Sequence, residues 1–336
     1  MAERTADLVG TTAIAPAPVV TMRAAAAITP GGPEVLTPTL VPAPTRVGSE
    51  VLVRVVAAGV NSVDAKTRAG SGVSGGVATW PMVPGFDFSG VVVESPYAEF
   101  PLQPGDEVFG MTAFPRTTGS YAEYVAVPAL NVARKPSTLS HVEAAAVPLA
   151  ALTAWGAVVD LAKAHEGQRI LIHAGAGGVG HLAVQFAAYF GAEVTATAST
   201  RNVDWVRRLG ANRVIDYTSE DFEEVLGDFD VVIDAVGGDT GRRSLTVLRP
   251  GGHLVSLPSS SWPTLVADAA AAGVRGTGFW VVPEASTLAV IGRLITSGDV
   301  RVMADSVFPL EQAAEAHRLL ETGHVRGKVV LRISDY

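Results

Sequence analysis

Cysteine is absent from the 336-residue chain. This absence excludes disulfide bonds, thiol catalysis and every metal site built on thiolates. Charged residues are also scarce, at 17% of the chain, whereas apolar residues reach 48%. That composition supplies large buried cores and excludes disorder for most of the chain. The length is about twice that of a typical single domain, so we expect two domains.

The chain also lacks runs of Lys and Arg, and its formal net charge is −8. Proteins that follow a phosphate backbone carry clustered positive charge, so we expect no nucleic-acid partner. A small molecule becomes the default ligand.

Neither a secretory signal nor a membrane span is expected. Residues 1–21 lack a basic start followed by a sustained apolar core, and we interpret them as a flexible N-terminal extension. Residues 170–192 contain no charged side chain, as a membrane span would, but five glycines in this stretch favour a strand, a turn and a helix in a buried core. We expect a cytoplasmic protein with no membrane contact.

Two kinds of pattern divide the chain. Short β-branched runs at 51–56, 90–93 and 121–127, separated by Pro and Gly turns, predict a mostly β domain. Ser140 and Glu143 form a capping box, after which strands and helices alternate as in a doubly wound parallel sheet. We expect strands at 169–174, 193–198, 213–216, 231–234 and 253–257, helices at 179–190, 203–209 and 240–248, and a tail with two helical stretches and a last strand at 328–332.

Residues 175–180 read GAGGVG and fit the pattern G-x-G-x-x-G. They follow an apolar strand and open an amphipathic helix that Gly191 ends, so backbone N–H groups gather where a pyrophosphate binds. A tight glycine turn that binds nothing is the alternative. The residues assigned to the cofactor here are Gly175, Gly177, Gly178, Val179 and Gly180.

The end of the second strand indicates which dinucleotide binds. A free ribose 2′-OH usually meets an Asp or Glu there, whereas residues 197–202 contain no carboxylate. Ser199 can donate a hydrogen bond, and Arg201 can pair with a 2′-phosphate through two N–H groups. These residues favour NADPH over NADH, although Arg201 could also be a solvated residue at a helix start.

Six motifs occur along the chain in a recognisable order: AGVNSVD (58–64) through Arg68, PGFDFSG (84–90), GDEV (105–108), GSYAEY (119–124), the glycine loop and GKVVL (327–331). With these motifs the chain resembles, from residue 22 to residue 333, the medium-chain dehydrogenase/reductase superfamily, in its zinc-free branch of quinone oxidoreductases and zeta-crystallin. The resemblance implies a GroES-like catalytic domain made from both chain ends, with a Rossmann domain inserted between them. We therefore expect residues 22–148 to form the catalytic domain, 149–283 the Rossmann domain, and 284–336 a segment that returns to the catalytic domain.

The resemblance also bears on zinc. Zinc-dependent relatives have Cys in place of Asn61, His-Glu in place of Phe86-Asp87, a third ligand near Leu149 and a four-cysteine structural lobe that is missing here. Without zinc to stabilise an alkoxide, alcohol dehydrogenation is disfavoured. Hydride delivery to an enone or quinone leaves charge on a carbonyl oxygen, where hydrogen-bond donors suffice.

Further site residues follow from the resemblance. At the catalytic end of the cleft it implies Asn61, Asp64 and Lys66. Asn61 could instead be only a turn residue before a helix, and Lys66, where relatives often have Tyr, only a solvated charge. The resemblance implies cofactor contacts from Thr153, Tyr217, Ala235, Val236, Leu257, Pro258, Phe279 and Val281. His173 and His181 flank the glycine loop, and we expect both to be packing residues.

The leading functional hypothesis is an NADPH-dependent, zinc-free reductase that delivers hydride to a quinone or an α,β-unsaturated carbonyl compound. A 2-enoyl thioester reductase is the alternative among enzymes, and a non-catalytic, crystallin-like NADPH-binding protein is the alternative from another class. Residues 274–282 predict an edge strand of the Rossmann domain. The pairing of this strand with its twin would give a homodimer.

Overall fold

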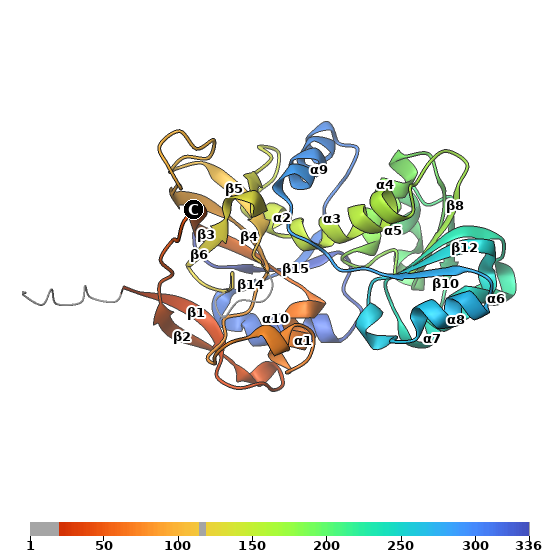
Figure 1. Ribbon diagram of the computed structural model, residues 1–336, viewed down its shortest axis with the longest axis horizontal. Coiled ribbons are helices and arrows are strands. Elements are labelled where there is room, and N and C mark those ends of the chain that lie inside the picture. The colour runs from red at the N-terminus through yellow and green to blue at the C-terminus, as the bar shows by residue number, and fades with distance from the viewer. Residues whose placement is uncertain (1–19, 114–118, 336) are drawn as a thin grey trace, which may run out of the picture.

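The computed structural model describes residues 20–113 and 119–335, which form two lobes side by side (Figure 1). Residues 1–19 of the extension predicted at 1–21 lie outside the described residues. The described part begins with an antiparallel pair, β1 (Thr21–Ala27) and β2 (Leu36–Pro42). Single bridges from Ala24 to Ala122 and from Ala27 to Met82 attach this pair to the first lobe.

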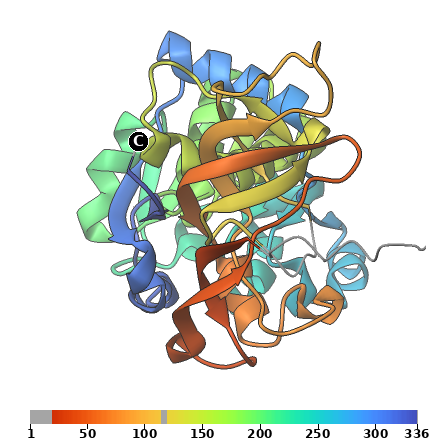
Figure 2. The same cartoon turned by 90° about the vertical axis from the view of Figure 1, so that its left-hand side faces the viewer.

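A seven-stranded sheet forms the first lobe, in the order β14–β15–β3–β4–β5–β7, with β6 also paired to β3. Its longest strand, β3 (Glu50–Val60), pairs antiparallel with β15 from the other end of the chain, with Val329 opposite Val60. Figure 2 shows this lobe from its outer side. The other strands are β4 (Asp87–Glu94), β5 (Glu107–Met111), β6 (Tyr124–Pro128), β7 (Val132–Arg134), β14 (Ala304–Pro309) and β15 (Lys328–Arg332).

The second lobe is a six-stranded parallel sheet in the order β10–β9–β8–β11–β12–β13. Residues on its strands alternate between two hydrophobic cores, as successive side chains of a strand must. Ile170 and Ile172 pack with α4 on one face, whereas Leu171 packs with α8 on the other. The strands are β8 (Arg169–Ile172), β9 (Glu193–Ala198), β10 (Arg213–Asp216), β11 (Phe229–Asp234), β12 (Leu248–Ser256) and β13 (Arg275–Gly278).

Helices cover both faces of the parallel sheet and fill the ends of the catalytic sheet. The α-helices are α1 (Ser62–Arg68), α2 (His141–Ala145), α3 (Pro148–Trp155), α4 (Gly180–Tyr189), α5 (Val203–Arg208), α6 (Phe222–Val225), α7 (Gly238–Arg243), α8 (Leu265–Ala271), α9 (Ala285–Ser297) and α10 (Ala313–Glu321). Short 3-10 helices are η1 (Pro33–Val35), η2 (Ser74–Gly76), η3 (Ala129–Asn131), η5 (Thr200–Asn202), η6 (Ser244–Val247), η7 (Ser259–Ser261) and η8 (Leu310–Gln312), and η4 (Gly156–Leu161) is a π-helix.

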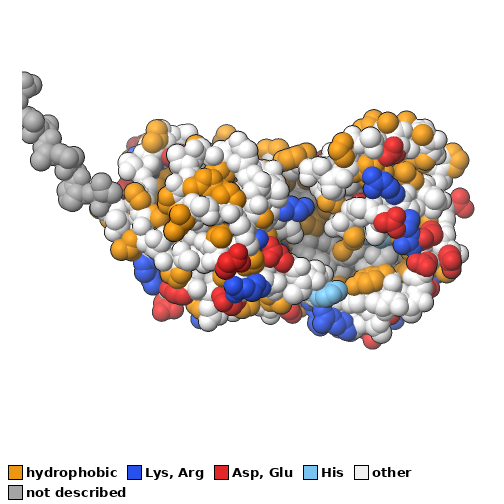
Figure 3. Space-filling view, turned by 90° about the horizontal axis from the view of Figure 1, so that it is seen from below, with side chains coloured by type: hydrophobic (Ala, Val, Ile, Leu, Met, Phe, Trp, Pro, Cys, Tyr) orange, Lys and Arg blue, Asp and Glu red, His pale blue; other side chains and the backbone are white. Residues whose placement is uncertain are grey.

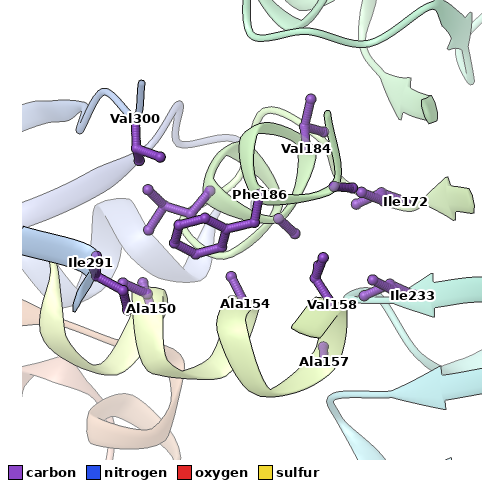
Figure 4. Close-up of a cluster of buried hydrophobic side chains, with 14 of the residues drawn as sticks. Ala150, Ala154, Ala157, Val158, Ile172, Val184, Phe186, Ile233, Ile291 and Val300 are labelled. Atoms are coloured by element: carbon purple, nitrogen blue, oxygen red, sulfur yellow. The ribbon is translucent and has the colours of Figure 1, made fainter. Parts of the chain in front are cut away.

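One buried cluster joins the two lobes. Helix α3 and the π-helix η4 pack against α4 and α9, with Ala150, Ala154 and Phe186 at the contact (Figure 4). Phe109 of the catalytic sheet belongs to the same cluster. Because interiors are close-packed, this shared core holds the faces of the cleft in a defined relation.

The predicted fold class is confirmed: a doubly wound parallel sheet is inserted between the parts of a mostly β lobe. The capping box is confirmed as well, because Glu143 N donates to Ser140 Oγ (3.3 Å) and Ser140 N donates to the Glu143 carboxylate (2.9 Å). No helix among the described residues is long and apolar enough to cross a membrane.

Two predicted elements differ from the structure, and one strand was not predicted. The edge strand expected at 274–282 ends at Gly278 of β13, because the next residue, Phe279, packs its ring over Gly156. The helix expected at 240–248 ends as η6, and β12 begins there, five residues before the predicted strand. Strand β14 was not expected, since its half-exposed, mixed sequence becomes a strand only by pairing with β15.

Candidate functional site

A cavity of about 470 Å³ lies between the two lobes, and Figure 3 shows the hollow from outside. Residues from both chain ends and from the parallel sheet line it, which places it at the carboxyl ends of the strands, where open α/β sheets bind ligands. Its volume suits a small molecule. The predicted site residues that line it are Asn61, Lys66, Thr153, Gly177, Gly178, Val179, Gly180, Ala235, Val236, Leu257, Pro258, Phe279 and Val281.

The glycine loop forms one wall of this cavity. Gly177 N donates to the carbonyl of Ala174 (2.8 Å), so the chain turns sharply between β8 and α4. A Cβ on Gly180 would lie 2.0 Å from Ala174 O, so only glycine fits there. The loop therefore leaves a bare backbone surface at the N-terminus of α4, which suits a pyrophosphate.

Gly175 differs from the other assigned residues of this loop, because it does not line the cavity. A Cβ at this position would lie 2.9 Å from the Cβ of Ala196 on β9. Its role is close packing of the loop on the sheet. The motif pattern alone does not separate glycines that face a ligand from those that face the next strand.

A second wall follows the ends of β11 and β12. The carboxylate of Asp234 accepts hydrogen bonds from Val236 N (2.9 Å) and Gly237 N (2.8 Å), which holds the loop after β11. Phe279 N donates to Ser256 O (3.1 Å) and continues the wall after β13. We did not predict the positioning role of Asp234, although a buried Asp before a glycine pair is a recognisable signal.

The catalytic lobe contributes a buried polar cluster at the opposite end. Asn61 is the residue directly before α1 and is only 5% exposed, and its Nδ2 donates to Asp87 Oδ2 (2.9 Å). Leu149 N donates to the other oxygen of Asp87 (2.7 Å). Lys328 from β15 donates through Nζ to Asn61 Oδ1 and to Val60 O (3.0 Å). Asn61 is thus both a residue that starts a helix and part of the cavity wall.

Lys328 was missed as a site residue although it lies in the GKVVL motif. It is 4% exposed, and burial lowers the pKa of its ammonium while the facing Asp87 raises it. Burial raises the pKa of Asp87, and the ammonium of Lys328 opposes that shift. A lysine directly before the apolar run of the last strand was the available signal.

Asp64 does not line the cavity and lies behind its wall. Its carboxylate accepts hydrogen bonds from Asn61 N (2.7 Å), Gly85 N (3.2 Å) and Tyr121 Oη (3.4 Å). Burial, together with the charge of Asp87, raises its pKa to about 7. Asp64 is the third residue of α1, and its carboxylate turns back toward the start of the helix. The hydrogen bond that it accepts from Asn61 N holds the backbone of Asn61 in place.

Lys66 lines the cavity and is exposed, so the structure places it at the predicted cleft. Thr153 also lines the cavity, and its hydroxyl donates to Leu149 O (2.7 Å) within α3. The exposed Lys66 and the buried Thr153 therefore both lie in the cavity wall near Asn61.

The residues predicted for a 2′-phosphate lie together outside the main cavity. Ser199 follows β9, Tyr217 follows β10, and Tyr217 N donates to Ala198 O (3.2 Å) between them. Arg201 Nη2 donates to the carbonyl of His324 (2.5 Å). This contact with the C-terminal segment was not predicted, since the two residues are 123 positions apart. The arrangement leaves hydroxyl and cationic groups beside the strand ends.

His173 and His181 are confirmed as packing residues. Both are buried, and burial lowers the pKa of each to about 4. His173 contacts Thr197 (3.2 Å) and Ser244 (2.9 Å), whereas His181 Nδ1 lies 2.9 Å from Gly177 O. Both rings are neutral near pH 7.

The donor set at Asn61 and Asp87 does not fit a metal ion. Both oxygens of Asp87 already accept hydrogen bonds, and the Lys328 ammonium lies 3.5 Å from one of them. The described residues contain no group of three or more His, Cys, Asp or Glu that could hold a metal. A divalent cation would have to displace a buried ammonium.

Two family models match the chain: the alcohol dehydrogenase GroES-like domain over residues 48–137 and the zinc-binding dehydrogenase over residues 209–331. The structure of the quinone oxidoreductase from Coxiella burnetii matches with a TM-score of 0.90 and 38% identity, covering 94% of this chain and 100% of that one. A mycobacterial protein complexed with NADPH matches with a TM-score of 0.83 and 29% identity, over 93% of this chain and 100% of that one.

Two relatives found by sequence are also named as a reductase and an oxidoreductase. The chain is 38% identical over 291 residues to the 2-methylene-furan-3-one reductase of Solanum lycopersicum, covering 84% of this chain and 71% of the relative. It is equally identical, over the same length, to the chloroplastic NADPH-dependent alkenal/one oxidoreductase of Arabidopsis thaliana, covering 84% and 72%. The fold and the cavity define a two-domain dehydrogenase/reductase. The chain belongs to the medium-chain dehydrogenase/reductase family, among its quinone and alkenal oxidoreductases.

Proposed function

We propose that this protein is an NADPH-dependent oxidoreductase that delivers hydride to a quinone or an α,β-unsaturated carbonyl compound without zinc. The observation that carries the proposal is the cavity itself, which joins a bare glycine loop at one end to the Asn61 amide at the other. A dinucleotide held along the loop would place its nicotinamide end near Asn61.

The cofactor side follows from the chain's own groups. The N–H groups at the start of α4 would hold the pyrophosphate, and Ser199, Arg201 and Tyr217 would surround a 2′-phosphate. Two relatives support this choice, one named as NADPH-dependent and one complexed with NADPH. When bound, NADPH supplies the hydride.

Asn61 is the group we assign to the acceptor. Its Nδ2 carries two hydrogens, and within residues 20–113 and 119–335 it makes one hydrogen bond, to Asp87. The second N–H is then available to the carbonyl oxygen of an acceptor, where negative charge develops as hydride reaches the β-carbon. The electron pair of the C=C bond moves toward that oxygen, and a proton from water completes the saturated carbonyl product.

Lys66 and Thr153 complete this assignment. Lys66 is exposed at the cavity and would contact the nicotinamide ribose or the acceptor at the entrance. Thr153 lies in the wall beneath, beside Leu149. Asp64 would act through Asn61, whose backbone N–H it holds.

Assembly as a homodimer is part of the same proposal. No strand among the described residues pairs with the outer edge of β13. Trp280 and Val282, just beyond that edge, are 63% and 71% exposed. An unpaired edge beside exposed apolar side chains suits pairing with a second copy across a twofold axis.

The decisive experiment is acceptor-dependent oxidation of NADPH, followed by its absorbance, with a panel of quinones, enones and 2-enoyl thioesters. We expect turnover with enones or quinones. If turnover occurs only with enoyl thioesters, the acceptor class is wrong. If NADPH binds tightly and no acceptor is reduced, the protein is a cofactor-binding protein and the proposal fails.

A further inference from the structure

Lys328 places a positive charge at the centre of the buried cluster. Its ammonium has three N–H donors and faces three acceptors: Val60 O (3.0 Å), Asn61 Oδ1 and Asp87 Oδ2 (3.5 Å). Two donors are hydrogen-bonded and the third lies toward the Asp87 carboxylate, so the ammonium is held on three sides by the chain although Lys328 lines the cavity. We therefore look for its effect on the reaction in the groups that it holds.

The main group that it holds is the Asn61 amide. An ammonium only donates, so the amide must turn Oδ1 toward Lys328 and Nδ2 toward the Asp87 carboxylate. Asp87 is in turn held by Leu149 N (2.7 Å) at the start of α3. The orientation of Asn61 is thus decided by the charges on either side.

The stem of Lys328 also lies against the glycine loop. Gly327 N donates to Ala176 O (2.9 Å), and a Cβ on Gly178 would lie 3.0 Å from Lys328 Cδ. Lys328 is therefore the residue that touches both the loop at the cofactor end and the amide at the acceptor end. Relative to Asn61 it lies 267 positions further along the chain.

We propose that Lys328 is a positioning residue for hydride transfer, whose ammonium orients the Asn61 amide so that one N–H faces the acceptor at a set distance from the glycine loop. This inference rests on the proposed function, because it assigns a task within that reaction. Precise placement of a hydrogen-bond donor matters, since a misplacement of about 1 Å can cost on the order of 100-fold in rate.

Lys328→Met tests the inference, and Lys135→Met is its matched control. Lys135 is half-buried, with a side chain only 5% exposed and its Nζ 3.1 Å from Glu107, but it does not line the cavity. We expect Lys328→Met to lower kcat by roughly 10- to 100-fold while the Kd for NADPH changes by less than about threefold. Lys135→Met should leave kcat unchanged. Equal kcat losses in both variants, or no loss in Lys328→Met, would overturn the inference.

A double-mutant cycle shows whether Lys328 acts through Asn61. Asn61→Ala removes the proposed donor and should lower kcat by about 100-fold or more. In that background, Lys328→Met should add less than about threefold, because the amide that it orients is gone. Losses that multiply would mean that Lys328 acts independently, against the inference.

A readout without turnover separates this inference from the proposed function. The chain contains only four asparagines, Asn61, Asn131, Asn202 and Asn212, so selective ¹⁵N-asparagine labelling gives four side-chain amide pairs in an NMR spectrum. Asn61→Ala identifies the Asn61 pair. We expect Lys328→Met to shift that pair and speed its exchange with water, and Lys135→Met to leave it unchanged. An unshifted Asn61 pair would overturn the inference even if the native protein reduces acceptors. A shifted pair, together with no turnover of any acceptor by the native protein, would mean that only the proposed function fails.

Removing the ammonium alone leaves Asp87 buried without its cation, which can prevent folding. The variant Asp87→Asn/Lys328→Met removes both charges and keeps the shapes of the side chains. We expect it to fold, with a displaced Asn61 pair and reduced kcat; the substitution at position 87 adds a fifth side-chain pair to the spectrum. A folded double variant with wild-type kcat and an unshifted Asn61 pair would overturn the inference.

Discussion

Gly156 lies directly beneath the ring of Phe279: a Cβ on Gly156 would be 2.3 Å from Phe279 Cζ. Gly156 begins the π-helix that follows α3, and such irregular turns occur frequently at functional sites. Phe279 lines the cavity beyond β13. The glycine therefore decides how closely the cavity wall approaches the helix that joins the two lobes.

Gly156→Ala is expected to weaken cofactor binding by displacing Phe279. Alanine favours a helix by about 1 kcal/mol over glycine, so a loss here would come from the clash with the ring. We expect the Kd for NADPH to rise by roughly 10-fold, measured by titration of the cofactor fluorescence. Gly75→Ala is the control, since a Cβ there meets nothing within 4 Å. Unchanged binding in Gly156→Ala would contradict this role of the contact.

Arg201→Ala tests the choice of cofactor. The substitution removes a charge-assisted hydrogen bond of about 1.5 to 3 kcal/mol, so the Kd for NADPH should rise by roughly 10- to 150-fold. NADH has no 2′-phosphate, and its Kd should stay nearly the same. Arg207→Ala, on the exposed side of α5 where Arg207 pairs with Asp204 (3.0 Å), should change neither. An equal loss for both cofactors would show that Arg201 does not meet the phosphate.

Local patterns predicted those parts of the site that neighbouring residues build. The loop residues 177–180 and the strand ends at Ala235 and Leu257 depend on strand, turn and helix signals within a few residues, and they line the cavity. The side chains that hold the acceptor end depend on distant contacts. Lys328 meets Asn61 only because β15 pairs with β3, and periodicity carries no information on that pairing.

Two differences between the predictions and the structure also have local explanations, one at Asp64 and one at the end of β13. Asp64 was expected at the cleft, but the third position of a short helix turns its carboxylate toward the backbone N–H of Asn61 (2.7 Å). Phe279 continues an apolar run that suits a strand. The strand nevertheless ends before it, because the ring of Phe279 packs against Gly156, which has no side chain. In both cases a tertiary or capping contact outweighs the periodic pattern.

We predict that the protein works without a metal, because both oxygens of Asp87 already accept hydrogen bonds. Purified protein should contain well below one zinc per chain by elemental analysis, and chelators should leave NADPH oxidation intact. The reason is that the place between Asn61 and Asp87 holds an ammonium, which a divalent cation would have to displace at a Coulombic cost. Stoichiometric zinc that resists dialysis would contradict this prediction.

Stability should fall as the pH drops below about 6.5. Burial lowers the pKa of His173 and His181 to about 4 and that of His317 to about 3, from an ordinary value of 6.5. The unfolded chain takes up these protons while the folded protein does not, so the stabilisation is fully present above pH 6.5 and is lost as the pH falls toward the folded values.

Asp64 works in the opposite direction, because burial and the charge of Asp87 raise its pKa from 3.8 to about 7. Its contribution is fully present below pH 3.8 and is lost as the pH rises through 7. Burial also lowers the pKa of His141 and His253, and it raises the pKa of Asp87, Asp160 and Asp234. With five histidines against four carboxyls we expect a net loss of stability on acidification from pH 7 to 5, with each proton contributing at most about 1.4 kcal/mol per pH unit. Urea unfolding at pH 7.0, 6.0 and 5.0 measures this slope, and His317→Gln should reduce it by one proton. A stability that stays constant from pH 7.0 to 5.0 would contradict the sign.

We predict that two copies of the chain form a dimer through the outer edge of β13. The strand presents an unpaired edge among the described elements, and Val282 lies four residues beyond its end with 71% of its surface exposed. Val282→Glu would bury a carboxylate in the predicted interface and should shift the protein to monomer, whereas Val266→Glu on α8, where valine is 68% exposed, should not. Sedimentation at low micromolar concentration should give twice the chain mass of 34.7 kDa for the native protein and for Val266→Glu, and a mass near 34.7 kDa for Val282→Glu. Since the exposed valine supports no core, its replacement should leave the thermal midpoint of the monomer intact. A native protein that sediments near 34.7 kDa with full activity would remove the support for edge pairing.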